Sequence, residues 1–234
     1  MPARRQANST SESVDNYLKA ILSLGGPEHH RVASTALSDH LGVAPASVTN
    51  MLQKLAAAET PLVEYERHRG VLLSVAGKRR ALEIVRHHRL IETFLYKVLD
   101  YPIEEVHDEA ERLEHFISER FEERIAAKLG HPRIDPHGHS IPTMEGEMIE
   151  PNSIPLTEVL QEGTFVIDSV SDRDSRTLRQ LKASGIKPGA RLRVRKNSSI
   201  GSYSVSIGRS SKPFSLSREA AGDIRLLPSK KLPS

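Results

Sequence analysis

The stretch STALSDHLGVAPASVTNMLQKLAAA, residues 34–58, carries the signals for two short helices joined by a tight turn. Ser34 can cap the first helix and Gly42 can end it, because glycine readily adopts the left-handed conformation common at helix ends. Pro45 stands in the first turn of the second helix, where its missing N–H is not needed. Two helices connected in this way predict a helix-turn-helix.

Outward from this pair, a hairpin completes a winged helix-turn-helix over residues 13–78. Apolar runs at 62–65 and 71–74 flank ERHRG, which predicts a two-stranded wing with a basic tip. The second helix begins with small and polar side chains, as a helix that approaches base edges must. The residues expected to contact DNA are Pro45, Ser47, Thr49, Asn50 and Lys54 on this helix and Arg67 and Arg69 on the wing. An αα-hairpin that binds nothing and a winged helix that binds protein are the alternatives.

Helical patterns continue on both sides of the winged helix. Residues 1–12 are polar and predict a disordered tail, and a helix is expected from Ser13. After the wing, one helix is expected over about 75–99 and another over about 103–129, within a helical domain at 79–149. The last of these helices carries a stripe at i, i+4, i+7 and i+8, which is His107, Glu111, Glu114 and His115.

This stripe of histidines and carboxylates has two interpretations. One is a solvated face held by ordinary salt bridges, and the other is half of a metal site. The preceding helix carries His88 and Glu92 one turn apart, and two antiparallel helices with inward His/Glu pairs favour the metal site. Because the chain has no cysteine, the donors suit Mn(II), Fe(II), Co(II) or Zn(II) better than Cu(I). His131, His137 and His139, in a Pro/Gly-rich loop, are expected to be turn and capping residues.

From Glu162 onward the sequence changes to short strand-like runs separated by Gly, Pro, Ser and Asp. With one short helix, LRQLKASGI, between them, this pattern predicts a small β-barrel of the Src-homology-three type over 162–228. A linker is expected at 150–161 and a tail at 229–234. The expected fold class is mainly α with β: a winged helix-turn-helix, a helical domain and a small β-barrel.

Charge is unevenly distributed along the 234 residues. By count, Lys and Arg number 8 against 7 Asp and Glu in residues 1–78, 10 against 15 in 79–149, and 15 against 8 in 150–234. The acidic middle requires solvent or a cation to neutralise it. No apolar run approaches the ~20 residues that span a bilayer, and the start has no secretory apolar region. A cytoplasmic chain with no membrane partner is therefore expected.

Three segments that follow the winged helix carry a family resemblance: RHHRLIETFL, VHDEAERLEHFISER and HPRIDPHGHSIP. Together they resemble the diphtheria toxin repressor family of iron- and manganese-dependent transcriptional regulators, and the resemblance runs from about Val14 to Leu227. It implies a homodimer that binds an inverted-repeat operator in double-stranded DNA. It also implies repression of metal-uptake genes and a helical domain that serves dimerisation and metal binding.

The resemblance further implies a set of metal ligands. Those on the two helices are His88, Glu92 and His107 in an ancillary site and Glu111, Glu114 and His115 in a primary site. The primary site takes a further ligand at the position of Asn16, and the second acidic ligand of manganese-responsive members falls on Lys19. Asp174 matches a carboxylate of the ancillary site, with Thr177 in the place of its amide partner. Iron-responsive members have Cys at position 111, whereas manganese-responsive members have Glu. Mn(II) is therefore the expected ion, with Fe(II) as the alternative and Co(II), Zn(II) and Cd(II) as substitutes.

Two functions from other classes use some of the same residues. A di-metal hydrolase needs an open coordination position and a nearby base or nucleophile, and no Ser-His pair or glycine-rich phosphate loop is evident. A metal-binding interaction module, whose basic C-terminal third binds a peptide, is the second alternative. The hydrolase would leave the winged helix unused, so the sequence favours a DNA-binding regulator that is not an enzyme.

Overall fold

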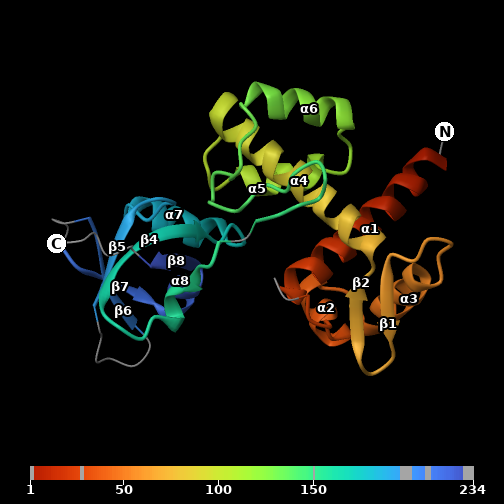
Figure 1. The fold of residues 1–234 in the computed structure, drawn as a ribbon, viewed down its shortest axis with the longest axis horizontal. Coiled ribbons are helices and arrows are strands. Elements are labelled where there is room, and N and C mark those ends of the chain that lie inside the picture. Colours follow the sequence, from red (N-terminus) through yellow and green to blue (C-terminus); the bar gives the residue numbers. More distant parts are fainter. Residues whose placement is uncertain (1–2, 27–28, 150, 196–201, 209–211, 229–234) are drawn as a thin grey trace. The chain divides into compact units, whose positions relative to one another are not determined.

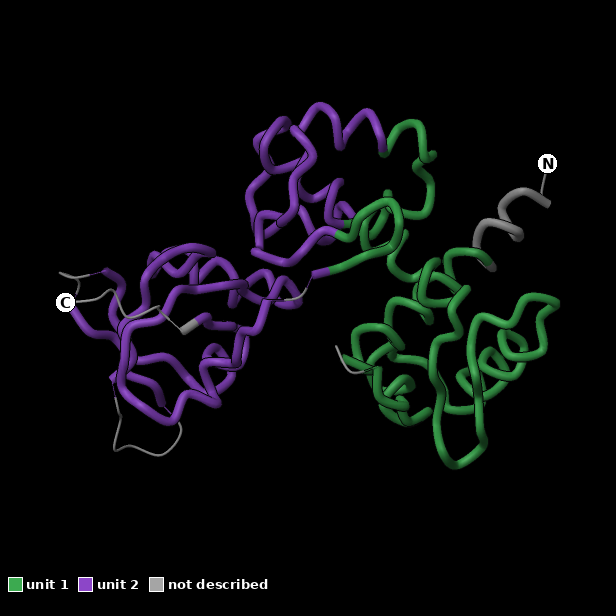
Figure 2. The backbone as a smooth tube through the Cα atoms, viewed as in Figure 1, with its two compact units in different colours: residues 1–88, 111–122, 142–148 green, residues 89–110, 123–141, 149–234 purple. Residues whose placement is uncertain are grey.

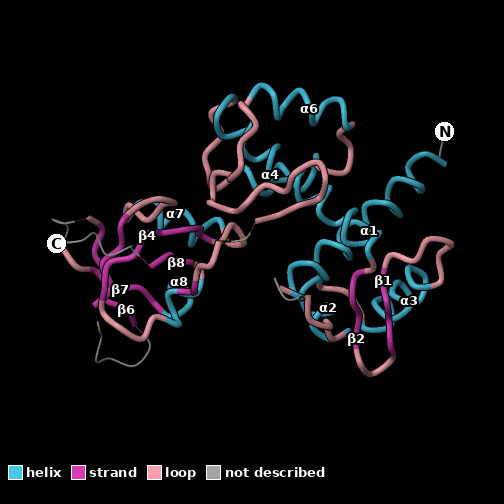
Figure 3. Tube along the Cα trace, viewed as in Figure 1, coloured by secondary structure: helices cyan, strands magenta, loops and turns pink. Residues whose placement is uncertain are grey.

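The structure, a computed structural model, describes residues 3–26, 29–149, 151–195, 202–208 and 212–228 (Figure 1). Its α-helices are α1 (Ala3–Gly25), α2 (Ser34–Leu41), α3 (Pro45–Ala56), α4 (Val75–Val98), α5 (Val106–Leu113), α6 (Glu119–Lys128), α7 (Ser175–Ala183) and α8 (Arg218–Gly222). Its strands are β1 (Val63–Glu66), β2 (Gly70–Leu73), β3 (Ile154–Pro155), β4 (Gly163–Val170), β5 (Arg191–Arg195), β6 (Ser202–Ile207), β7 (Phe214–Ser217) and β8 (Ile224–Pro228), and a 3-10 turn, η1, spans Leu156–Glu158 (Figure 3).

The chain divides into two compact units, which Figure 2 shows in different colours. Unit 1 consists of residues 1–88, 111–122 and 142–148, and unit 2 consists of residues 89–110, 123–141 and 149–234. Within the described residues, no helix is both long enough and apolar enough to cross a membrane.

Unit 1 contains the helix-turn-helix that the sequence predicts. Gly42 ends α2 in a left-handed conformation, and its N–H donates to the carbonyl of Ser38. α3 then begins with Pro45 in its first turn. The predicted cap at Ser34 is wrong, because Ser34 is the first helical residue and Ala33 precedes it without a side-chain hydrogen bond. The turn between α2 and α3 is thus fixed by a glycine and a proline at the expected positions.

The wing is the antiparallel pair of β1 and β2, whose turn at 67–69 forms the basic tip. Gly70, at the first position of β2, has a φ of +97°, and an added Cβ would lie 2.5 Å from the carbonyl oxygen of Val32. Val32 pairs with Val71 through two backbone hydrogen bonds of 2.9 Å. A side chain at position 70 would therefore separate the wing from the segment before α2.

One apolar core holds the winged helix together. Leu18 of α1, Leu37 of α2, Leu52 of α3 and Val71 of β2 are all fully buried in it. These positions recur at helical spacing on each helix, so burial of one stripe per helix packs the elements on one another. α1 is thus part of the same rigid core as α3.

The N-terminal end of α1 differs from its prediction. Residues 3–12, expected in a disordered tail, are helical because α1 begins at Ala3. No glycine or proline occurs between residues 3 and 24, so the helix propagates backward from its buried half at 14–22. Residues 1–2 and the predicted tail at 229–234 lie outside the described residues.

The predicted helix over 103–129 is wrong, because the structure has two helices in its place. α5 ends at Leu113, and the N–H of Phe116 donates to the Leu113 carbonyl in a turn. α6 starts after Ser118, whose carbonyl and hydroxyl both accept from the N–H of Phe121, at 2.8 and 3.3 Å. Glu114 and His115 therefore lie beyond the end of α5, and the four-residue stripe does not share one helix.

Unit 2 contains a six-stranded antiparallel sheet in the order β3-β8-β4-β5-β6-β7. The predicted strand-rich C-terminal domain is confirmed, but the closed barrel is wrong, since β3 and β7 are the two edge strands and do not pair with each other within the described residues. β3 has two residues, and the second, Pro155, has no N–H to donate to another strand. The sheet surrounds a core that includes Leu156, Ile167, Leu192 and Ile224.

Candidate metal centre

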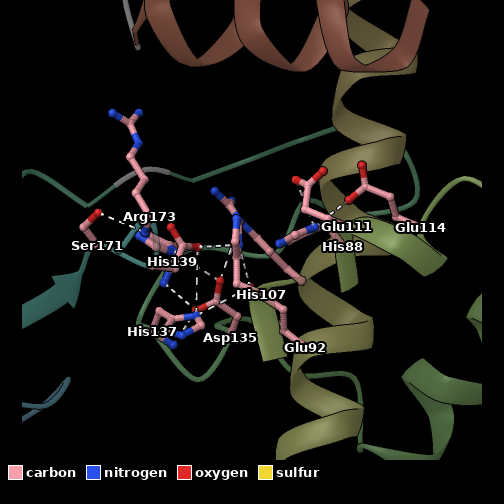
Figure 4. A network of polar contacts seen from close by, with 12 residues as sticks. His88, Glu92, His107, Glu111, Glu114, Asp135, His137, His139, Ser171 and Arg173 are labelled. Carbon is pink, nitrogen blue, oxygen red and sulfur yellow. Dashed lines mark hydrogen bonds and ion pairs between the residues drawn. The ribbon is translucent and has the colours of Figure 1, made fainter. Parts of the chain in front are cut away.

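The first cluster lies in unit 1 and consists of Lys19, His88, Glu111 and Glu114. α1 supplies Lys19, α4 supplies His88, α5 supplies Glu111, and Glu114 directly follows α5. Lys19 Nζ lies 2.6 Å from Glu111 Oε1 and 2.6 Å from Glu114 Oε1. His88 Nδ1 lies 2.5 Å from Glu114 Oε2, and Figure 4 shows these side chains pointing toward one another. Lys19 of α1 and His88 of α4 therefore converge on the carboxylates of Glu111 and Glu114.

Glu114 is the centre of the first cluster and is fully buried. Its backbone is held from the α4 side, because His87 Nδ1 lies 3.2 Å from the Glu114 carbonyl oxygen. His87 is held in turn by Glu122 at 2.9 Å, and Arg86 also contacts Glu122. A buried carboxylate without a partner is costly, so the charged groups around Glu114 are required for its burial.

The carboxylates beside Lys19 keep its side chain positively charged. Burial alone would lower the pKa of Lys19, but the carboxylates of Glu114 and Glu111 outweigh it and raise the pKa. The ammonium group is therefore charged at neutral pH and neutralises part of the negative charge of the cluster. Position 19, where the resemblance implies an acidic ligand in manganese-responsive members, here supplies a cation that contacts both carboxylates.

Of two further predicted ligands, His115 contacts the first cluster, and Asn16 lies on α1 three residues before Lys19. His115 Nε2 lies 3.3 Å from Glu114 Oε1, and His115 Nδ1 lies 3.4 Å from Asp15 Oδ2. Asp15 also receives Arg80 Nε at 2.6 Å; burial would raise the Asp15 pKa, but His115 and Arg80 lower it. The Asn16 Oδ1 atom is buried and has no hydrogen-bond partner among the described residues. This oxygen, on α1, is thus an unused hydrogen-bond acceptor.

The second cluster lies in unit 2, and its members are Glu92, His107, Asp135, His137, His139 and Asp172 (Figure 4). His107 Nδ1 lies 3.4 Å from Glu92 Oε1 and 3.5 Å from Asp172 Oδ2. His137 Nδ1 lies 3.6 Å from the same Glu92 oxygen. His139 Nδ1 lies 3.8 Å from the same Asp172 oxygen. Three imidazoles therefore surround the carboxylates of α4 and of the loop after β4.

The loop at 135–139 is shaped by Asp135, whose Oδ1 accepts from the N–H groups of His137 at 2.8 Å and His139 at 2.9 Å. Gly138 has a φ of +95°, and an added Cβ would lie 2.1 Å from the carbonyl oxygen of Asp168 on β4. The N–H of Val170 donates to the His137 carbonyl at 3.0 Å. Close approach at Gly138 thus docks the loop on β4 and brings both histidines to Asp172.

His137 is held in one orientation inside the second cluster. Its side chain is fully buried, and Nε2 lies 3.1 Å from the carbonyl oxygen of Ile103. Because a carbonyl only accepts, Nε2 carries the proton and donates, which leaves the lone pair on Nδ1 when the ring is neutral. Nδ1 has no hydrogen-bond partner among the described residues. This is the arrangement in which a histidine ligates a metal ion.

The second cluster pairs negatively charged carboxylates with histidines whose pKa values are raised. Burial would lower the histidine pKa values, but Asp172 and Glu92 raise the pKa of His107 to about 10, and Glu92 raises that of His137 to about 9. Burial would raise the pKa of Asp172, but contact with His107 lowers it well below its usual range. Protons on the imidazoles balance the carboxylates here, and a cation that displaced these protons would perform the same role.

Asp174, the metal ligand predicted in the C-terminal domain, caps a helix instead of contacting the second cluster. It is the N-cap of α7 and accepts from the N–H of Arg176 at 3.1 Å and the hydroxyl of Thr177 at 2.7 Å. Its side chain is about half exposed, whereas Asp172 reaches the second cluster. The signal that could have separated them is the SDRDS sequence, in which the aspartate next to the helix is the one expected to cap it.

Asp135, His137 and His139 were also missed: the two histidines were expected to be turn and capping residues of a loop rich in proline and glycine, and no role was predicted for Asp135. Only Asp135 acts in that way, through one of its two oxygens. The spacing i, i+2, i+4 was the available signal, since in a tight loop it brings three side chains together, and their ligand atoms lie within 4.8 Å of one another. His88, which the resemblance groups with Glu92 and His107, has a ligand atom within 4.8 Å of those of Glu92, His107 and Asp172, and it also contacts Glu114.

The donors of both clusters fit a divalent cation. The first offers two carboxylates, from Glu111 and Glu114, and the imidazole of His88. The second offers carboxylates and imidazoles, one of which, His137, presents Nδ1 without a hydrogen-bond partner in the described part of the chain. Oxygen and imidazole donors without thiolate suit Mn(II), Fe(II), Co(II) or Zn(II).

The predicted DNA-facing residues lie on the surface of the winged helix. Pro45, Ser47, Asn50 and Lys54 of α3 are exposed, as are Arg67 and Arg69 at the tip of the wing. Thr49 is half-buried, and its hydroxyl donates to the Pro45 carbonyl at 3.1 Å. Arg69 Nη1 lies 2.8 Å from Glu66 Oε2, which holds its guanidinium along the wing.

Three family models of known proteins together match nearly the whole chain. Residues 9–71 match the family model of the iron dependent repressor N-terminal DNA binding domain, residues 74–143 match the iron dependent repressor metal binding and dimerisation domain, and residues 154–227 match the FeoA domain. The HTH-type transcriptional regulator MntR of Bacillus pumilus is 33% identical over 116 residues, which cover 50% of this chain and 78% of that protein. The iron-dependent repressor IdeR of Mycobacterium tuberculosis is 28% identical over 200 residues, which cover 80% of this chain and 85% of that protein.

Solved structures of metal-dependent repressors are also similar to this chain. A manganese-dependent transcriptional repressor in complex with manganese is 37% identical, with a TM-score of 0.84 over 92% of this chain and 99% of that chain. ScaR with bound Zn²⁺ is 30% identical, with a TM-score of 0.78 over 92% of this chain and 99% of that chain. Sequence, fold and matched domains all lead to one assignment. The chain belongs to the diphtheria toxin repressor family of metal-dependent transcriptional regulators.

Proposed function

We propose that this chain is a homodimeric, metal-dependent repressor of metal-uptake genes, with Mn(II) as its ion and Fe(II) as the alternative. The first cluster carries the proposal, because there α1 of the winged helix-turn-helix contacts carboxylates of the matched metal-binding and dimerisation domain. The matched domains are those of DNA-binding repressors and not of a hydrolase. Its work on DNA would be done in the cytoplasm.

The first metal site is proposed to draw its ligands from the predicted primary set and from α4. Its members are Asn16, His88, Glu111, Glu114 and His115. The contacts of Glu114 with His88 at 2.5 Å and with His115 at 3.3 Å support this set. The buried Asn16 oxygen, which has no hydrogen-bond partner among the residues described, supports a ligand from α1.

The second metal site is proposed to use Glu92, His107, His137 and Asp172, with Asp135 and His139 beside them. Its support is the convergence of three Nδ1 atoms on Glu92 and Asp172 at 3.4–3.8 Å. These residues join α4, α5 and the loop before α7 within unit 2. The site is therefore proposed to hold the sheet domain on the helical half of its own unit.

Mn(II) is the proposed ion because the donors are hard to borderline. Neither site can include a thiolate, since the chain has no cysteine. Carboxylate oxygens suit Mn(II), and imidazole admits Fe(II), Co(II) and Zn(II) as well. The printed descriptions of the related solved structures, which include complexes with manganese, Zn²⁺ and Cd²⁺, support the same range of ions.

The proposed control of DNA binding works through α1. When bound, a divalent ion supplies positive charge that offsets the repulsion between Glu111 and Glu114. α1 shares one buried core with α2 and α3, so the position of α1 relative to α5 determines where the recognition helix lies. Ligands on both helices therefore favour one orientation of α3, and a preference for that orientation is sufficient to shift the population.

The proposed DNA interface consists of the exposed start of α3 and the tip of the wing. Side chains at Ser47 and Asn50 would approach base edges in the major groove, while Arg67 and Lys54 would contact phosphates. Each protomer of a homodimer would read one half of an inverted-repeat operator in adjacent major grooves. The exposure of these residues supports the assignment.

The test is metal-dependent recovery of DNA. Sheared genomic DNA from the source organism would be mixed with the metal-free full-length chain, with Mn(II), with Fe(II) under anaerobic conditions, or with EDTA, and the retained fragments sequenced. We expect a small set of inverted-repeat fragments, enriched near metal-transport genes, with Mn(II) and not with EDTA. Equal enrichment with EDTA, or no enrichment with either ion, would contradict the proposal.

A further inference from the structure

Lys19 is the positive charge inside the first cluster. Its Nζ lies 2.6 Å from one oxygen of Glu111 and 2.6 Å from one oxygen of Glu114, so it bridges the two carboxylates. The Lys19 side chain is 18% exposed and that of Glu114 is 0% exposed, which keeps solvent away from this pair. The ammonium group therefore interacts with the Glu114 carboxylate at low screening, whereas Glu111, 40% exposed, is partly solvated.

α1 brings two different groups to this position. Asn16 and Lys19 are three residues apart on the helix, so they lie on the same side of α1, one turn from each other. The Asn16 oxygen is a buried acceptor with no hydrogen-bond partner among the described residues, whereas Lys19 is a donor that uses Glu111 and Glu114. α1 thus places a buried neutral oxygen and the cation that contacts both carboxylates one helical turn apart.

A divalent ion and the Lys19 ammonium would compete for the same oxygens. Each carboxylate oxygen has lone pairs for more than one contact, so geometry alone would admit both. Two positive groups that share a partner oxygen would lie only a few ångströms apart, and at that separation their repulsion changes affinity by orders of magnitude. Occupation by both at once is therefore strongly disfavoured.

We propose that Lys19 is a built-in competitor for the metal ion at the first cluster. In the metal-free chain it holds Glu111 and Glu114 on α1, and it leaves these oxygens when a divalent ion takes them. Metal binding is then an exchange of cations, which weakens the apparent affinity and sets the ion concentration at which the site fills. This inference rests on the proposed function only in that the first cluster takes an ion.

The test is Mn(II) binding to metal-free full-length chains by isothermal titration calorimetry. All chains carry Asp172→Asn, so that binding at the second cluster is weakened and the first cluster can be measured. Lys19→Gln removes the charge but keeps a polar side chain, and Lys19→Arg keeps the charge. Arg31→Gln is the matched control, because it removes a 2.6 Å ion pair with Glu66 in the same unit but away from the cluster.

Lys19→Gln is expected to lower the Tm of the metal-free chain and to tighten the Kd for Mn(II) about tenfold or more. Its gain in Tm on addition of Mn(II) should exceed that of the unsubstituted position. Lys19→Arg and Arg31→Gln should leave the Kd within about threefold. A structural role for Lys19 alone would lower Tm without tightening Kd, and that result would overturn the inference.

Two further results would also overturn it: weaker Mn(II) binding by Lys19→Gln, or equal tightening by Lys19→Arg. The inference and the proposed function can fail separately. If Mn(II) does not cause DNA recovery but Lys19→Gln still tightens Mn(II) binding, the function fails and the exchange stands. If DNA recovery depends on Mn(II) and Lys19→Gln binds no more tightly, only the exchange fails.

Discussion

Asp172 and Asp174 lie two residues apart in the loop before α7, and their carboxylates contact different groups. Asp172 Oδ2 lies within 4.0 Å of three imidazole nitrogens of the second cluster. Asp174 accepts from the backbone and side chain of the first turn of α7. The helix start decides which is which, because the residue immediately before a helix is the one positioned to cap it.

Substitution of each aspartate by alanine should separate these roles. Asp172→Ala is expected to weaken metal binding at the second cluster about tenfold or more, because it removes a carboxylate that contacts His107 and His139. Asp174→Ala should leave metal binding unchanged and lower the Tm through loss of the cap. Equilibrium dialysis with Mn(II) and thermal unfolding measure the two effects. Loss of metal by Asp174→Ala instead would contradict the assignment.

Asn16→Asp is expected to tighten Mn(II) binding at the first cluster about tenfold, because it gives a buried neutral acceptor a negative charge. The same change should lower the stability of the metal-free chain, since it puts a negative charge on a buried atom that has no hydrogen-bond partner among the described residues. Calorimetric titration with Mn(II) measures the affinity, and Asn50→Asp on the exposed surface is the matched control. Weaker binding by Asn16→Asp would show that this side chain is not a ligand.

At the scale of elements, the interruption between α5 and α6 was the feature that sequence could not supply. Residues 113–119 contain neither glycine nor proline, so periodicity alone extends one helix through them. The interruption depends on tertiary contacts, such as that of His87 with the Glu114 carbonyl. By contrast, the bounds of α4 followed closely from its pattern, because its ends are marked by the wing and by Asp100-Tyr101-Pro102.

The loop that carries His137 and His139 depends on Gly138. Gly138→Ala is expected to cost about 2–4 kcal/mol, because the new Cβ would meet the Asp168 carbonyl at 2.1 Å and φ is +95°. It should also weaken metal binding at the second cluster. Gly189→Ala separates clash from backbone strain, since φ is +80° there and nothing lies within 4 Å, so about 1 kcal/mol is expected. Equal costs at the two positions in thermal unfolding would contradict the docking role.

At the scale of the whole molecule, local signals predicted the winged helix and the strand-rich C-terminal domain but not the closure of the sheet. Strand existence follows from short apolar runs between turn residues, whereas closure depends on whether the first and last strands can pair. β3 has only two residues and ends in Pro155, which leaves it an edge strand. The candidate ligands on α4 and α5 were found from helical spacing, but partners from loops, such as Asp135 and Asp172, follow from tertiary structure.

Each unit contains one candidate site, and the two sites have different expected effects. The first cluster connects α1 to α5 and Glu114 within unit 1, so it is expected to control DNA binding. The second connects the helical half of unit 2 to the loop after β4, so it is expected to stabilise that unit. Removal of metal should therefore affect both DNA binding and thermal stability, but through different residues.

In the proposed mechanism, a metal ion bound at the first cluster is required for DNA binding. Fluorescence anisotropy of a labelled operator duplex, titrated with Mn(II), measures it in the unsubstituted chain and in Glu114→Ala, with light scattering to check the dimer. We expect Mn(II)-dependent binding by the unsubstituted chain, and an intact Glu114→Ala dimer whose affinity for the duplex does not rise with Mn(II). An unchanged Mn(II) response in Glu114→Ala would contradict it.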